Sequence, residues 1–179
     1  KSPGVDNIQY EHIKSTIDIM IPIYNKLFNI ILDTGTIPKC WTEGNIIPIY
    51  KNKGNCEAPE NYRPITLLSC FGKLFTAILN NRLNKYVDEY EIIGNHKAGF
   101  RKNHSTIDNL FVLHCLLDML GAQNKKLFCA FIDFKQAFDK VWRQGLWTKL
   151  LKYNINGKCF NVVKNMYSNI KSRIKTNEG

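Results

Sequence analysis

The sequence predicts a helix-rich α+β fold, and three features of its apolar pattern carry that prediction. Apolar residues recur at helical spacing in several separate stretches. Residues 45–50 and 62–68 are short apolar runs of strand length, separated by a polar loop. Residues 127–132 form a continuous apolar run, flanked by Lys126 and Asp133, which is typical of a buried central strand.

The helical stretches are punctuated by residues that start or stop helices. Residues 8–32 are expected to form two helices that meet near Pro22, the second ending at Gly35. Ser105 and Asp108 have the spacing of a capping box at the start of another helix. Further helices are predicted from these apolar patterns: 71–83, 142–151 and 160–170.

The two short runs predict a β-hairpin with a basic tip. Pro48 cannot donate a backbone hydrogen bond, so residues 45–50 are expected to be an edge strand. Residues 51–55 form the polar loop, and residues 62–68 return as the second strand.

Composition narrows the class of protein. The chain has 179 residues, a net charge of +10 and 44% hydrophobic residues, which excludes disordered and fibrous classes. No apolar run is long enough for a membrane span, so no membrane partner is expected. Residues 120–179 hold 12 Lys and Arg against 3 Asp and Glu, which suits either a surface for a polyanion or a solubilising face.

The cysteines and the first residue give weaker indications. The 6 cysteines lack metal-ligand spacing, and we expect reduced thiols rather than a disulfide framework. The chain begins at Lys1 without a signal-peptide pattern, and we expect it to be cut from a longer polypeptide.

Asp133 is the most informative single residue. It ends the apolar run, where a bare buried carboxylate costs several kcal/mol unless a cation meets it. Mg²⁺ is held by one or two carboxylates together with substrate phosphates, so Asp133 is a candidate metal ligand. The alternative is that it caps a following helix that starts near Gln136.

Other candidate residues are cationic or aromatic. Lys51, Lys53 and Arg63 lie on the predicted hairpin and could converge on one anion. Residues 101–104 place Arg101 and Lys102 before the Ser105-capped helix. Taken singly, such a cationic segment is more often a solvated face than a site, but both segments together with Asp133 favour phosphoryl transfer. Phe138 could lie beside a substrate held at Asp133 or simply pack in a core.

Five blocks in order resemble the LINE-type (non-LTR) retrotransposon reverse transcriptases. Residues 127–141 (LFCAFIDFKQAFDKV) look like the first catalytic motif of that family. The preceding blocks resemble its earlier motifs in the expected order, and the likeness covers essentially the whole chain: 1–6 (KSPGVD), 47–54 (IPIYKNKG), 61–68 (NYRPITLL) and 99–106 (GFRKNHST).

The resemblance implies a right-hand polymerase, with fingers at residues 1–126 and the first, truncated part of the palm at 127–179. Two Mg²⁺ ions, with Mn²⁺ as an alternative, would support transfer of deoxynucleotides to a DNA 3′-hydroxyl on an RNA template. The implied partners are the RNA template, the DNA primer, deoxynucleoside triphosphates and the remaining palm and thumb of the same polyprotein. The implied location is intracellular, in cytoplasm and nucleus.

The resemblance also implies individual roles. Asp133 would bind metal together with the backbone carbonyl of Phe134, and Phe138 would exclude a 2′-hydroxyl from the nucleotide. Lys51 and Arg63 would grip the triphosphate. The template would lie along these residues: Lys53, Arg101 and Lys102.

The later family blocks, including the aromatic-Ala-Asp-Asp hairpin with the remaining metal carboxylate, do not occur in the sequence. We therefore expect the 179 residues alone to be inactive. Two alternatives remain open: a non-enzymatic retroelement remnant that at most binds nucleic acid, and an unrelated basic α/β domain.

Overall fold

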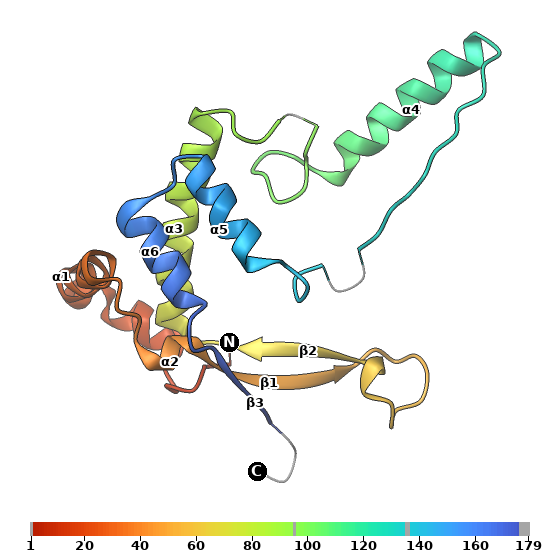
Figure 1. Cartoon of the computed structure of the whole chain (residues 1–179). Coiled ribbons are helices and arrows are strands. Elements are labelled where there is room, and N and C mark those ends of the chain that lie inside the picture. The colour runs from red at the N-terminus through yellow and green to blue at the C-terminus, as the bar shows by residue number, and fades with distance from the viewer. Residues whose placement is uncertain (1, 95, 135–136, 176–179) are drawn as a thin grey trace. The chain divides into compact units, whose positions relative to one another are not determined.

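The computed structural model describes residues 2–94, 96–134 and 137–175 (Figure 1). The chain divides into two compact units. Unit 1 comprises Lys1–Leu83 and Gln144–Gly179, and unit 2 comprises Asn84–Arg143. The fold is helix-rich with one small mixed sheet, which confirms the predicted α+β class.

The first helix of unit 1 is a single element, α1 (Tyr10–Thr34), so the prediction of two helices was wrong. Pro22 lies inside it, where it cannot donate a hydrogen bond to the Asp18 carbonyl and its ring crowds that carbonyl. Both residues are exposed, so water can satisfy that carbonyl and the helix continues. The predicted end at Gly35 is confirmed: its φ is 69°, and its N–H donates to the Ile31 oxygen at 2.9 Å.

The core of unit 1 lies between four helices: α1, α2 (Lys39–Thr42), α3 (Cys70–Glu89) and α6 (Gly157–Met166). Its buried residues are Ile31, Trp41, Phe75, Leu79 and Val162. The Trp41 and Phe75 rings have centroids 5.5 Å apart. A Cβ at Gly72 would lie 3.2 Å from the Trp41 ring, so a side chain at this position of α3 would press on the buried indole.

Helix α5 (Arg143–Lys152) joins this unit through Trp147, which is buried. Its ring lies 6.2 Å from Phe160 of α6 and 5.7 Å from Tyr167. The helices predicted around 71–83 and 142–151 are therefore confirmed.

The sheet of unit 1 has the strand order β2-β1-β3. Strands β1 (Glu43–Tyr50) and β2 (Tyr62–Leu67) are antiparallel, which confirms the predicted hairpin. A short 3₁₀ turn, Pro59–Asn61, precedes β2. Strand β3 (Lys171–Ile174) pairs in parallel with the first half of β1.

Residues 45–50 were predicted to be an edge strand. That prediction was wrong for Asn45 and Ile46, because the start of β1 lies between β2 and β3 and pairs with both. It holds locally at Pro48, which pairs with Pro64 beyond the end of β3 and so is never required to donate to a third strand. The helix predicted for 160–170 was too long. It ends at Met166, Asn169 adopts a φ of 60°, and the chain then extends into β3.

Unit 2 contains α4 (Thr106–Ala122), and the predicted cap is confirmed. The Ser105 hydroxyl accepts from the Ile107 N–H at 3.2 Å, and the Asp108 carboxylate accepts from the Ser105 N–H at 2.7 Å. None of the residues of α4 is buried.

The prediction of a buried strand at residues 127–132 was wrong. These residues belong to no strand or helix, and Phe128 and Ile132 are 89% and 82% exposed. An apolar run becomes a buried strand only where another strand pairs with it and other elements cover it, and neither occurs in the described part of the chain. Residues 137–140 form a turn, while the start predicted for a helix near Gln136 lies outside the described residues.

No helix among the described residues is long and apolar enough to cross a membrane. All six cysteines are free, as expected for reduced thiols.

Candidate functional site

Two of the predicted cations lie on one face of the hairpin. Arg63 pairs with Ile49 across β1 and β2, and the Lys51 N–H donates to the Asn61 oxygen at 2.8 Å. Because side chains alternate along a strand, Lys51 and Arg63 point to the same face as diagonal neighbours, which typically lie about 7–8 Å apart. Tyr50 and Tyr62 occupy the opposite face, with ring centroids 5.4 Å apart.

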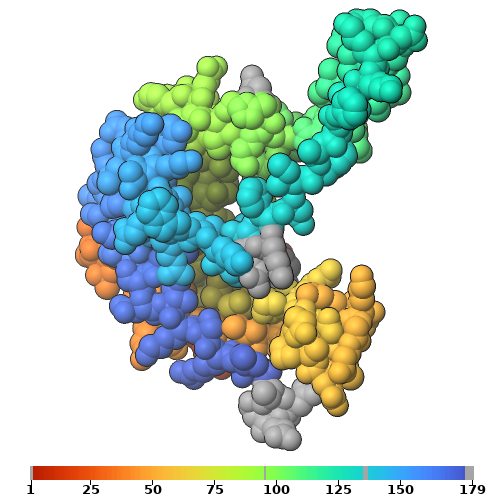
Figure 2. All heavy atoms as spheres, turned by 45° about the vertical axis from the view of Figure 1, so that its right-hand side comes forward, coloured from red at the N-terminus to blue at the C-terminus, as the bar shows by residue number. Residues whose placement is uncertain are grey.

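The loop between the strands is shaped by its own hydrogen bonds. The Asn61 amide donates to the Asn55 carbonyl at 2.8 Å, and the Tyr62 hydroxyl donates to the Cys56 carbonyl at 2.8 Å. Asn52 and Gly54 have φ values of 54° and 83°, which turn the chain back. Figure 2 shows the resulting compact tip in orange and yellow.

The two lysines of this tip differ in their surroundings. The Lys51 ammonium donates to the Glu60 carbonyl at 2.6 Å, which fixes its position and leaves two of its three protons for an anion. Lys53 is exposed. The hairpin thus offers one ordered and one solvated ammonium beside an exposed Arg63 guanidinium.

Arg101 of unit 2, which was expected to lie along a template, contacts residues of its own unit instead. The Arg101 side chain is only 18% exposed, lies 3.5 Å from the Asp88 carboxylate and donates to the Gly94 carbonyl at 3.3 Å. Its guanidinium is therefore engaged within unit 2 in this conformation. The neighbouring Lys102 is exposed.

Asp133 is an exposed carboxylate, not the buried one that the strand prediction required. Phe134 beside it is exposed as well. Phe138 lies near Phe100, with ring centroids 6.1 Å apart and an edge-to-face orientation that the sequence did not indicate.

A metal site needs several ligands in one place. Among the described residues, no group of three or more His, Cys, Asp or Glu side chains could hold an ion. The exposed Asp133 carboxylate, an oxygen ligand of the kind that Mg²⁺ prefers, fits as one ligand of a larger set.

The structure thus places the predicted residues in two groups. Unit 1 carries Lys51, Lys53 and Arg63 on the hairpin. Unit 2 carries the others: Arg101, Lys102, Asp133, Phe134 and Phe138.

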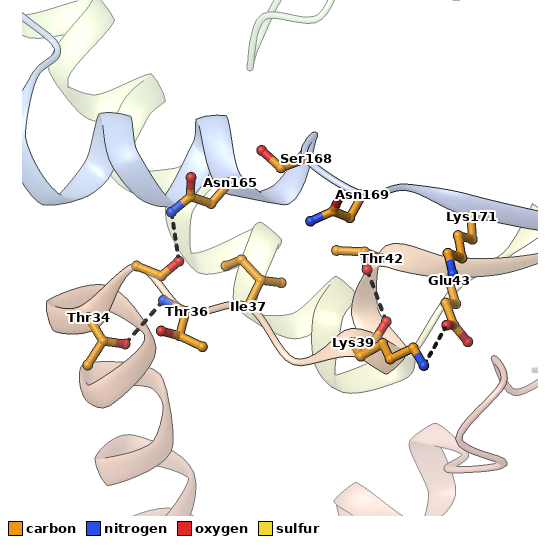
Figure 3. A pocket seen from close by; sticks show the side chains of 11 residues that line it. Thr34, Thr36, Ile37, Lys39, Thr42, Glu43, Asn165, Ser168, Asn169 and Lys171 are labelled. Carbon is orange, nitrogen blue, oxygen red and sulfur yellow. Dashed lines mark hydrogen bonds and ion pairs between the residues drawn. The ribbon is translucent and has the colours of Figure 1, made fainter.

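A polar cleft of about 560 Å³ in unit 1 was missed by sequence reasoning. It lies where α1, α2, β1, α6 and the approach to β3 meet, and its lining is mostly hydroxyl, amide and charged groups (Figure 3). The Asn165 amide donates to the Gly35 carbonyl at 3.0 Å on one side, and the Lys39 ammonium lies 3.9 Å from the Glu43 carboxylate on the other. Of the residues that line this cleft, only Gly35 was singled out by the sequence, as the end of a helix. The cleft itself could not be predicted, because its other residues come from distant segments of the chain.

Two cysteine thiols of unit 1 have altered acidity. Burial raises the pKa of Cys159, partly opposed by the positive charge of Arg82. Burial also raises the pKa of Cys40, helped by the negative charge of Asp6. Both thiols are therefore kept protonated at neutral pH and are poor nucleophiles.

Comparison with known proteins tests the resemblance. Residues 49–179 match the family described as "Reverse transcriptase (RNA-dependent DNA polymerase)". The chain is 39% identical over 154 residues to the "Probable RNA-directed DNA polymerase from transposon BS" of Drosophila melanogaster, covering 85% of this chain and 17% of that protein.

Two further relatives from Drosophila melanogaster agree. The "RNA-directed DNA polymerase from mobile element jockey" is 34% identical over 82% of this chain and 16% of its own length. The "Probable RNA-directed DNA polymerase from transposon X-element" is 31% identical over 92% of this chain and 18% of its own length. The chain therefore spans less than a fifth of each of these relatives.

These matches confirm the resemblance that the ordered motifs indicated. The chain belongs to the reverse transcriptase family, in its LINE-type retrotransposon branch.

Proposed function

We propose that the chain is part of the catalytic domain of an RNA-directed DNA polymerase that adds deoxynucleotides to a DNA 3′-hydroxyl on an RNA template. The family match over residues 49–179 carries this proposal, because it spans both the hairpin cations and the Asp133 motif. The relatives bear the name of this activity and are much longer than the chain.

Within that domain, residues 1–126 are proposed to be fingers and residues 127–179 the opening of the palm. The order of the five sequence blocks supports this division. The proposed boundary at residue 126 falls within unit 2, so the division rests on motif order rather than on the compact units.

Lys51 and Arg63 are proposed to bind the triphosphate of the incoming nucleotide. Their shared face supports this role, because a guanidinium fork and an ammonium then approach one anion from the same side. Phe138 is proposed to stand beside the sugar and exclude a 2′-hydroxyl. Its exposed ring is free to meet a ligand on the side away from Phe100.

Lys53, Arg101 and Lys102 are proposed to follow the template backbone. The exposed ammonium groups of Lys53 and Lys102 support this role directly. Arg101 would have to exchange its contact with Asp88 for a phosphate, which is a charge-for-charge replacement.

Asp133, with the Phe134 carbonyl, is proposed to contribute ligands to a Mg²⁺ site completed by other residues of the polymerase. When bound, two such ions would activate the primer hydroxyl and neutralise charge on the transferring phosphoryl group. The 179 residues alone are then expected not to incorporate nucleotide, because their described part offers no complete ligand set.

The test is RNA-templated incorporation of labelled deoxynucleotide into a DNA primer. The purified 179-residue chain should give none, and the same residues within a polypeptide of the relatives' full length should give a product that depends on Asp133. A full-length polypeptide that binds template and primer but never extends the primer would instead favour the second candidate, a non-enzymatic remnant. The exposed cations of the hairpin are the observation that favours that candidate, since nucleic-acid binding needs no metal site.

A further inference from the structure

The last strand of unit 1 places its cations on a single face. Strand β3 and the residue after it read Lys171-Ser172-Arg173-Ile174-Lys175, so charged residues alternate with uncharged ones. Because successive side chains of a strand point to opposite faces, Lys171, Arg173 and Lys175 share one face, about 6.6 Å apart along the strand. We call these three residues the β3 ladder.

The anchoring of α6 fixes where this ladder lies. Val162 is fully buried in the core, and the Lys158 ammonium lies 2.8 Å from the Asp33 carboxylate at the end of α1. The Asn165 amide bonds the Gly35 carbonyl at 3.0 Å. The chain then leaves α6 along β1, where the Lys175 N–H donates to the Ile46 oxygen at 2.9 Å.

The pairing register puts the ladder on the same face as the hairpin cations. Arg173 pairs with Asn45 of β1, and Asn45 in turn pairs with Leu67 of β2. Counting by two from Leu67 along β2 leads to Arg63, so Arg63 and Arg173 emerge from one side of the three-stranded sheet. Figure 1 shows β3 running beside β1 on the side away from β2.

This face holds far more positive than negative charge. Within strands β1, β2 and β3, Glu43 is the one acidic residue. It is 14% exposed, and its carboxylate lies 3.8 Å from the Arg173 guanidinium and 3.9 Å from the Lys39 ammonium. Arg173 nevertheless remains 75% exposed. Among the described residues, no carboxylate lies within 4.0 Å of the ammonium groups of Lys171 and Lys175.

We propose that the β3 ladder binds the phosphodiester backbone of a nucleic-acid strand lying across this sheet face. The inference rests on the proposed polymerase function and adds to it a contact surface outside the hairpin and the Arg101 segment. The cations contact phosphates, so the surface recognises charge and not base sequence. It also assigns a location to 3 of the 12 Lys and Arg residues that the sequence holds after residue 120.

The β3 ladder could instead protect the edge of the sheet without binding nucleic acid. Lysines on an exposed edge strand also prevent pairing with another sheet. That protective role requires no nucleic acid and predicts that loss of the ladder leaves the salt dependence of binding unchanged.

The experiment measures binding of a labelled single-stranded RNA to the 179-residue chain by fluorescence anisotropy across a salt series. The ladder variant carries Lys171→Gln, Arg173→Gln and Lys175→Gln. The matched control removes the same charge from three exposed helix lysines of unit 1 by Lys14→Gln, Lys26→Gln and Lys149→Gln. For single strands, the log–log salt slope should fall by about 0.7 per lost phosphate contact in the ladder variant and stay unchanged in the control.

Two single substitutions keep the result interpretable if the triple variant folds poorly. Arg173→Lys preserves the charge and should retain the slope. Glu43→Gln removes the carboxylate from the face, so it should tighten binding at low salt.

Equal slopes for the ladder and control variants, or no tightening in Glu43→Gln, would overturn the proposal. Displacement of the RNA by excess deoxynucleoside triphosphate from the wild type but not from the ladder variant would assign the ladder to the nucleotide, and would overturn it too. None of these readouts requires catalysis, so failure of the polymerase proposal in the incorporation assay is a separate result.

Discussion

Gly35 shows how one residue joins two distant segments of the chain. It ends α1 with a φ of 69°, and its carbonyl accepts the bond from Asn165 that holds α6. A Cβ there would lie 3.1 Å from the Asn165 amide nitrogen. The position therefore combines a left-handed backbone with a close approach, and both favour glycine.

The substitution Gly35→Ala should lower the free energy of unfolding by about 1–2 kcal/mol, because an L-residue is strained at this φ. Urea denaturation followed by circular dichroism measures the change. The control is Gly121→Ala in α4, where a Cβ meets nothing within 4 Å and a helical alanine should stabilise by up to about 1 kcal/mol. Equal effects of the two substitutions would contradict this account of Gly35.

The raised pKa values of Cys159 and Cys40 predict slow alkylation of these two thiols. Near neutral pH, brief treatment with iodoacetamide should modify the exposed Cys56, Cys115 and Cys129 first, as mass spectrometry of the peptides can show. Labelling of Cys159 as fast as Cys56 would contradict the prediction.

The same pKa shifts give stability a pH dependence in the alkaline range. The folded chain holds these thiol protons to higher pH than the unfolded chain, whose thiols have a pKa of about 8.5. The stabilising contribution is therefore complete below that pH and is lost as the pH rises through the folded values. A Cys159→Ala variant should show a smaller loss of stability above that pH than the wild type, and an equal loss would argue against this origin.

At the scale of elements, α3 and α4 differ sharply in how they are supported. Helix α3 places Phe75 and Leu79 in the core of unit 1, whereas α4 has no buried residue among those described. Leu110 of α4 is 63% exposed. Stability of α3 thus comes from packing, and that of α4 from its cap and its local propensity.

Replacing a large side chain by alanine should therefore lower the free energy of unfolding by different amounts in the two helices. Phe75→Ala should lower the free energy of unfolding by about 3–5 kcal/mol, because it empties a packed core position. Leu110→Ala should change it by less than about 0.5 kcal/mol, because the side chain is solvated. Denaturant titration of both variants checks this, and a large cost for Leu110→Ala would show that α4 is packed in solution.

Elements with local signals were predictable from the sequence, and elements that depend on distant partners were not. The Ser105 cap, the Gly35 stop and the apolar stripe around Phe75 each lie within a few residues, and all three were predicted. The strand character of residues 171–174 depends on β1, more than 120 residues earlier, and was missed. The run 127–132 was wrongly expected to be a buried strand because its composition cannot supply a partner strand.

At the scale of the whole molecule, the residue types of the candidate site came from sequence motifs, and their surroundings came from the structure. Family membership was readable from five ordered blocks. The sequence did not reveal that Arg101 pairs with Asp88, or that Arg63 and Arg173 share one face of the sheet. Both features depend on the tertiary arrangement of distant segments.

The central claim is that the chain supplies Asp133 as an essential metal-binding carboxylate of an RNA-directed DNA polymerase. The most direct test is RNA-templated incorporation of labelled deoxynucleotide by a polypeptide of the relatives' full length that contains these residues. Asp133→Asn should reduce incorporation to the level without enzyme, because an amide cannot replace a carboxylate charge at a metal. The matched variant Asp118→Asn, which alters an exposed carboxylate of α4 outside the motif blocks, should leave incorporation unchanged. Full incorporation by the Asp133→Asn polypeptide would contradict the account.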